Sequence, residues 1–160
     1  MDLYEKLLAE VTESGIDVYE VDMHSNVKGL YADGVIWINS RLSRAEKAAV
    51  LAEEFGHHKK TVGNILDQKQ TGNRKQELLA RTWAFEKLMP LASIIEAHRR
   101  GIQNRHELSE YLGLPEHFIE QAIKRYQQKY GTHVRVGKYT IIFIPFFGVL
   151  EFFEEGQALG

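Results

Sequence analysis

Apolar residues recur along this chain with helical and strand periods, and the changes between the two periods outline its elements. Leu3, Leu7 and Leu8 share one face of residues 2–13, a spacing that predicts an amphipathic helix ending at residues 14–15. Similar spacing, interrupted by Gly and Pro, recurs in the middle of the chain. It predicts further helices over residues 74–88, 94–99, 106–112 and 117–130.

The segments between the first two helices have the pattern of strands. Residues 16–21 are rich in β-branched side chains, and residues 30–38 predict a hairpin. Asp33 and Gly34 favour a two-residue turn there, because both central positions of such a turn need positive φ. Residues 35–38 are apolar on both faces, which predicts an interior strand. Residues 133–153 also have the pattern of strands.

A helix is predicted to begin after Ser43, since Ser43 and Glu46 match the S-x-x-E capping box. Gly56 and the polar residues after His58 suggest its end, and residues 59–72 are expected to form a polar loop. The elements together predict an α+β fold. In it a small antiparallel sheet packs on two helices, followed by a helical segment and a C-terminal β unit.

The chain length permits one ordinary domain or a core with a small appendage. We expect residues 1–90 to form the core, with residues 91–160 packed on it as one compact unit. Net charge is −2 over 160 residues, which argues against a nucleic-acid binder, and the absence of cysteine excludes disulfides and thiolate chemistry. The N-terminus is unlike a secretory signal, and residues 139–150 are too short to span a membrane, so a cytoplasmic protein is expected.

Candidate chemistry is concentrated in residues 51–58. Glu53, Glu54 and His57 stand where an H-E-x-x-H helix has a metal ligand, a general base and a second ligand, with glutamate in place of the first histidine. A catalytic site needs a third protein ligand, and Glu77 on the next helix is the best candidate. Gly56 lacks a side chain, which would let another element approach the site.

Two other interpretations of this run remain open. The pair Glu54 and His58 has the same spacing, but it puts Phe55 where the base should be. All four polar residues could also form a solvated face, because short motifs recur by chance. For stabilising an oxyanion the sequence offers Tyr31, Arg81 and His98 without distinguishing among them.

Three blocks in order carry a family resemblance. They are a strand at residues 36–39, the helix at residues 51–58, and a last block of Glu77, Ala80, Trp83, Ala84 and Leu88-Met89-Pro90. The chain resembles the ImmA/IrrE metallo-endopeptidases of phages, prophages and mobile elements, over roughly residues 16–90. The resemblance implies that Glu77 is the third ligand, that Glu54 is the general base, and that a helix-turn-helix repressor is the protein substrate. Zinc is the expected cofactor, although Glu53 tilts the preference toward manganese or iron.

Residues 108–123 have the cadence of a helix-turn-helix, with Gly113 in the turn. A DNA-binding role is disfavoured, since residues 91–131 carry six Arg or Lys against five Glu, a balance of only +1. A helical unit that packs on the core or grips a protein substrate fits better. The alternatives to a metallo-endopeptidase are therefore a catalytically silent protein-binding module and, after it, a small DNA-binding regulator.

Overall fold

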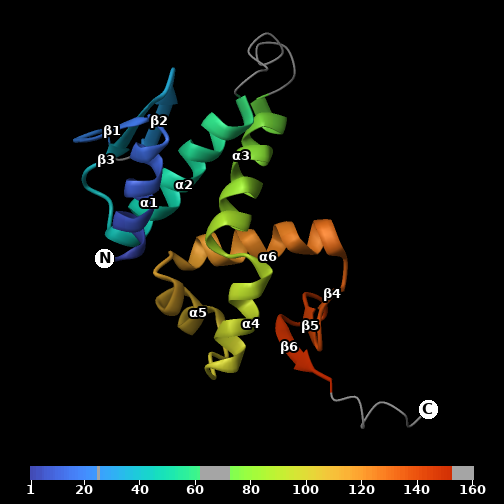
Figure 1. The fold of residues 1–160 in the computed structure, drawn as a ribbon. Coiled ribbons are helices and arrows are strands. Elements are labelled where there is room, and N and C mark those ends of the chain that lie inside the picture. The colour runs from blue at the N-terminus through green and yellow to red at the C-terminus, as the bar shows by residue number, and fades with distance from the viewer. Residues whose placement is uncertain (25, 62–72, 153–160) are drawn as a thin grey trace.

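The computed structural model describes residues 1–24, 26–61 and 73–152, and within them it has helices at the centre and a small sheet at either end (Figure 1). In chain order the elements are α1 (Leu3–Glu13), β1 (Asp17–Val21), β2 (Gly29–Ala32), β3 (Val35–Asn39), α2 (Arg44–Thr61), α3 (Asn73–Leu88), α4 (Leu91–Arg99), α5 (Arg105–Leu112), α6 (Glu116–Tyr130), β4 (His133–Val136), β5 (Tyr139–Ile142) and β6 (Gly148–Glu151). The predicted α+β class is confirmed.

The first sheet has the order β1-β3-β2, so the doubly apolar strand β3 is interior, as predicted. The β2–β3 hairpin turns at Asp33 and Gly34, with φ of 47° and 79°. The sheet is mixed rather than purely antiparallel, because β1 runs parallel to β3. In the β2–β3 hairpin, β2 pairs with one edge of β3. Only the other edge of β3 is then left for β1.

Helix α2 begins with half of the predicted capping box: Glu46 N donates to Ser43 Oγ at 3.2 Å. The Glu46 carboxylate instead accepts from His117 Nε2 of α6 at 2.6 Å. The helix continues to Thr61, past the end expected at Gly56 to His58. Gly56 therefore lies inside the helix and has a packing role there. Residues 59–61, where a polar loop was expected to begin, are helical, and residues 62–72 of that predicted loop lie outside the described part of the chain.

One hydrophobic cluster runs through both halves of the chain. It joins the buried faces of α1, β3 and α2 to those of α3, α4 and α6. Helix α6 contributes Phe118, Ile119, Ala122, Ile123 and Tyr126. The Tyr126 hydroxyl donates to Met89 O at 2.8 Å, which ties α6 to the end of α3. The two halves are thus packed around a shared core.

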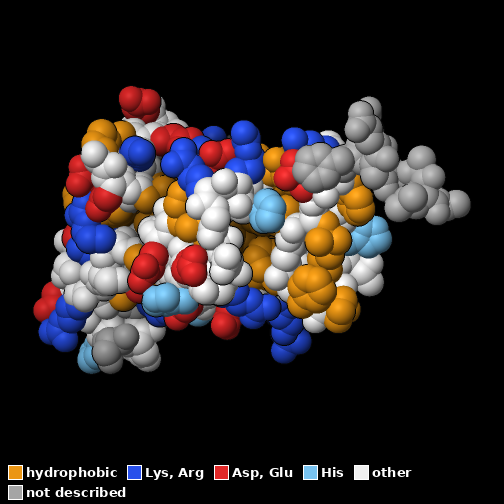
Figure 2. All heavy atoms as spheres, turned by 90° about the horizontal axis from the view of Figure 1, so that it is seen from below, with side chains coloured by type: hydrophobic (Ala, Val, Ile, Leu, Met, Phe, Trp, Pro, Cys, Tyr) orange, Lys and Arg blue, Asp and Glu red, His pale blue; other side chains and the backbone are white. Residues whose placement is uncertain are grey.

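The terminal strands β4, β5 and β6 form an antiparallel sheet, as the sequence predicts. Phe143 is buried against Tyr126 and Tyr130 of α6. Ile144, Phe146 and Leu150 are exposed, so only part of this apolar end is buried. Figure 2 shows hydrophobic side chains gathered on the terminal unit. Among the described helices, none is both long and apolar enough to cross a membrane.

Candidate metal centre

The site lies where α2 and α3 touch along their length. A Cβ built on Gly56 would stand 2.5 Å from the carbonyl oxygen of Ala80 and 3.1 Å from its carbonyl carbon. Real Cβ atoms do not approach backbone this closely, so only glycine permits this helix separation. The prediction that Gly56 lets another element come close is confirmed, and that element is α3.

Glu53, His57 and Glu77 come together at this contact. Glu53 and His57 are four residues apart and share one face of α2, and Glu77 projects from the first turns of α3. Each offers one ligand atom, and these atoms lie within 4.8 Å of one another. His57 Nε2 and Glu77 Oε1 are 3.2 Å apart. Within the described residues, this is the one group of three acidic or imidazole side chains close enough to share a metal ion.

The donor set fits a divalent cation. Zinc holds nitrogen and oxygen ligands at about 2.0–2.2 Å, so atoms around it lie within about 4.4 Å of each other. A separation of 4.8 Å at most therefore closes with small side-chain rotations. The three side chains are half-buried, which leaves the position open to substrate and water.

Glu54 lies beside the cluster and is half-buried. Its Oε2 atom is buried and has no hydrogen-bond partner in the described structure. Burial raises the pKa of Glu54 to about 7, and the nearby carboxylates of Glu53 and Glu77 add to the increase. A carboxyl that titrates near neutral pH is suited to accept and return a proton.

The neighbouring histidine points elsewhere. His58 Nδ1 and the Tyr31 hydroxyl are hydrogen-bonded at 2.8 Å, and the His58 ring stacks on Phe55. Burial, and then the charge of Lys59, lowers the pKa of His58. His58 is thus part of the contact between α2 and the β2–β3 hairpin, outside the three-residue cluster.

Arg81, one of the three residues considered for stabilising an oxyanion, is a close neighbour of the cluster. Its Nε donates to Glu53 Oε1 at 3.3 Å. Arg81 follows Glu77 by four residues, so it projects from the same face of α3. That spacing is a signal that could have indicated the contact of Arg81 with the ligand cluster. Arg81 therefore supplies a positive charge next to the carboxylate of Glu53.

A cavity of about 350 Å³ opens beside Glu53 and Glu54. One side is α2, from Glu46 to Glu54, and α3 contributes Arg81. Residues from the start of α6 complete the lining, and no sequence pattern indicated that α6 would reach this place. Strand β2 is also close, since a Cβ on Gly29 would lie 2.5 Å from Val50 Cγ1 and 3.5 Å from Glu54 Cγ.

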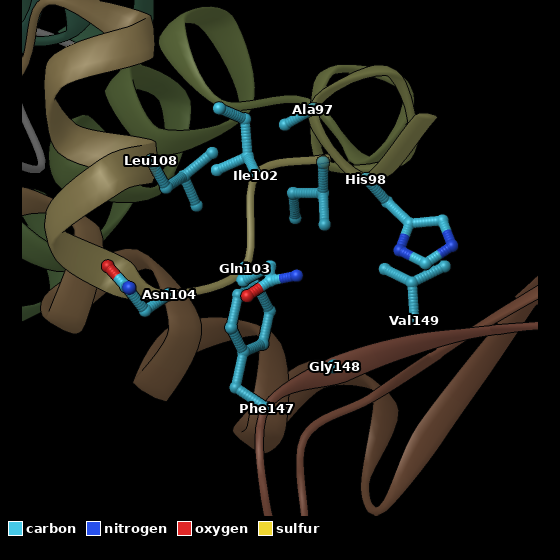
Figure 3. Close-up of a pocket in the computed structure, with 10 residues that line it drawn as sticks. Ala97, His98, Ile102, Gln103, Asn104, Leu108, Phe147, Gly148 and Val149 are labelled. Atoms are coloured by element: carbon cyan, nitrogen blue, oxygen red, sulfur yellow. The ribbon is translucent and has the colours of Figure 1, made fainter. Parts of the chain in front are cut away.

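A second cavity, of about 210 Å³, lies between α4, α5 and the terminal sheet. Figure 3 shows Ile102 and Leu108 on one side of it and Phe147 and Val149 on the other. His98 lines this second cavity, and Tyr31 is engaged with His58. Of the three residues considered for an oxyanion, only Arg81 lines the same cavity as Glu54.

A comparison with known families identifies the family of the chain. The model of the IrrE N-terminal-like domain, peptidase family M78, matches residues 9–124. The chain belongs to this family. The cluster of Glu53, His57 and Glu77 and the half-buried Glu54 therefore belong to a member of a peptidase family. Membership of this family implies a protein substrate. No curated protein matches the chain.

Proposed function

We propose that this protein is a metal-dependent endopeptidase in which Glu53, His57 and Glu77 hold the cation and Glu54 is the general base. The observation that supports the proposal most is the combination of three convergent ligand side chains with a buried carboxyl of raised pKa. Perturbed carboxyls beside such clusters are typical of catalytic sites. Membership of a peptidase family supports the same reaction class.

The chain's own residues account for the proton transfers. A divalent cation at the cluster supplies Lewis acidity that polarises the scissile carbonyl and acidifies the attacking water. Glu54 accepts the proton of that water, and its Oε2 is available because no described group bonds to it. Glu54 then returns the proton to the leaving amine.

Zinc is the proposed cofactor, with manganese or iron as the alternatives. Two carboxylates and one imidazole are a harder and more anionic set than two imidazoles and one carboxylate. Such a set favours manganese and iron relatively more than the usual zinc site does. We expect zinc to bind more weakly here than at an intact H-E-x-x-H site.

The proposed substrate is a helix-turn-helix repressor of the phage type, whose cleavage derepresses a prophage or mobile element. Support for it comes from the resemblance of residues 36–39, 51–58 and 77–90 to the ImmA/IrrE family. Such repressors act on DNA in the cytoplasm, which is therefore the compartment we propose.

The test uses a repressor encoded next to the gene and purified protein loaded with zinc or manganese. Cleavage by the wild type and none by Glu54→Gln, with metal content equal in both, is the expected result. Derepression by Glu54→Gln as strong as by wild type would instead indicate a silent binding module. Failure to bind either metal would exclude the enzyme. Binding to random duplex DNA with a steep salt dependence would favour a DNA-binding regulator.

A further inference from the structure

The cavity beside Glu54 has the dimensions of a peptide groove. Along α2 it extends from Glu53 and Glu54 to Glu46, seven to eight residues away. At a helical rise of 1.5 Å per residue this is roughly 10–12 Å. An extended peptide advances about 3.3 Å per residue, so the groove holds about three residues on one side of a bond placed at Glu54.

The wall opposite α2 is formed by the first turns of α6. His117 and Gln121 are exposed, four residues apart, and both line the cavity. His117 is held in place, because its Nε2 donates to Glu46 Oε1 at 2.6 Å. Between the walls the floor is apolar: Phe118 of α6 packs edge-on against Phe85 of α3, with ring centroids 5.2 Å apart.

This arrangement bears on the helix-turn-helix cadence of α5 and α6. A DNA-reading unit presents the N-terminal residues of its second helix to the major groove. Here those residues line the groove next to Glu54, and His117 is paired with Glu46. The opposite face of α6 is buried in the core through Ile119, Ala122 and Ile123. The residues that would read DNA are thus turned toward the candidate active site.

We propose that the first turns of α6 grip an extended segment of the protein substrate, with His117 and Gln121 hydrogen-bonding its backbone and the Phe85–Phe118 floor receiving an apolar side chain. The helix-turn-helix-like segment is then part of the substrate site. The link between peptide binding in this groove and cleavage rests on the proposed function. Binding of a peptide can nevertheless be measured without any cleavage.

The probe is a displayed pool of random 12-residue peptides, selected on zinc-loaded Glu54→Gln protein. Four proteins are compared: Glu54→Gln alone, the same with Gln121→Ala, the same with His117→Ala and Gln121→Ala, and the same with Glu120→Ala and Lys124→Ala. The last pair is exposed on α6 outside the cavity and serves as the matched control. Circular dichroism checks folding. Glu54→Gln with Gln121→Ala alone is included, because His117 also contacts α2.

Selected peptides are expected to share an apolar position and to bind about tenfold more weakly to the groove variant, since two hydrogen bonds are lost. The control should bind them like the parent, and Gln121→Ala alone should show part of the loss. Equal binding to groove variant and control, or no selected peptide at all, overturns the proposal. Peptides that bind through the groove but that wild-type protein never cleaves count against the proposed function alone. Peptides cleaved equally by wild type and by a His117→Ala, Gln121→Ala variant with Glu54 intact count against the groove alone.

Discussion

Arg81 on α3 donates its Nε to Glu53 Oε1 on α2 across 3.3 Å. Glu53 stands where an H-E-x-x-H helix has a neutral histidine, so the chain has gained a negative charge at that position and a guanidinium beside it. The positive charge is on the helix that also supplies Glu77. A cation bound to Glu53 has to share that carboxylate with Arg81.

Replacing Arg81 with Gln should therefore strengthen zinc binding at low salt. Removal of a half-exposed positive charge next to the ligands is expected to tighten the dissociation constant by about two- to fivefold, the range of a surface ion pair. Competition with a chromophoric chelator measures it, and Arg81→Lys should stay close to wild type. Weaker binding by Arg81→Gln would show instead that Arg81 orients Glu53 for the metal.

Gly56→Ala should separate the two helices that carry the ligands. The added methyl meets the backbone of Ala80, which cannot rotate away. We expect a loss of about 1–3 kcal/mol in the free energy of unfolding, as for overpacked cores, together with weaker zinc binding. Urea unfolding and metal titration check both effects. Lys60→Ala, at an exposed position of α2, is the control, and a Gly56→Ala protein with unchanged affinity would contradict the packing argument.

The adjacent histidines should behave differently. His57→Ala removes one of the three proposed ligands. Losing a residue that only hydrogen-bonds to a ligand typically weakens metal binding by about 10–100-fold, so losing His57 itself should weaken zinc binding by more than that. His58→Ala should keep zinc affinity but lose about 0.5–1.5 kcal/mol of stability, because the bond to Tyr31 is gone. Tyr31→Phe should reproduce the stability loss. If His58→Ala lost zinc affinity and His57→Ala kept it, His58 rather than His57 would be the metal ligand.

Glu54 should make the stability of the metal-free protein depend on pH. Its pKa rises from 4.5 to about 7 on folding, so the folded state binds more protons between these values. The free energy of unfolding should then fall as pH rises through this range and level off above it. Glu54→Gln has no carboxyl to ionise at this position, so its free energy of unfolding should not fall in this way. In urea unfolding with a chelator present, the variant should be increasingly more stable than wild type from about pH 5 to pH 8. Glu120→Gln should show no such trend, and an equal advantage at both pH values would refute the argument.

Local patterns in the sequence were sufficient for much of the fold. The Asp33-Gly34 turn, the interior strand β3 and the end of α3 before Pro90 each follow from residues that are neighbours in the chain. The set of Glu53, His57 and Glu77 was also foreseeable, since Glu53 and His57 have helical spacing and Glu77 is the best candidate on the next helix.

Features that depend on distant packing were not foreseeable. The pair Glu46 and His117 joins residues 71 positions apart, and neither residue carries a signal for the other. The parallel pairing of β1 depends on which edge of β3 the hairpin leaves free. Gly56 was read as a possible helix end because a local pattern cannot distinguish a terminating glycine from one pressed against another helix.

The contact between Gly56 and Ala80 has a consequence for how a cation arrives. The span between ligands on α2 and α3 is set by backbones that touch at Gly56 and Ala80, both of which are buried. We therefore expect the ligands to be gathered before metal binds, unlike those of a zinc finger, whose fold forms only with its ion. Chelation should therefore strip this protein of its cation and leave its secondary structure intact, and metal should return without a refolding step.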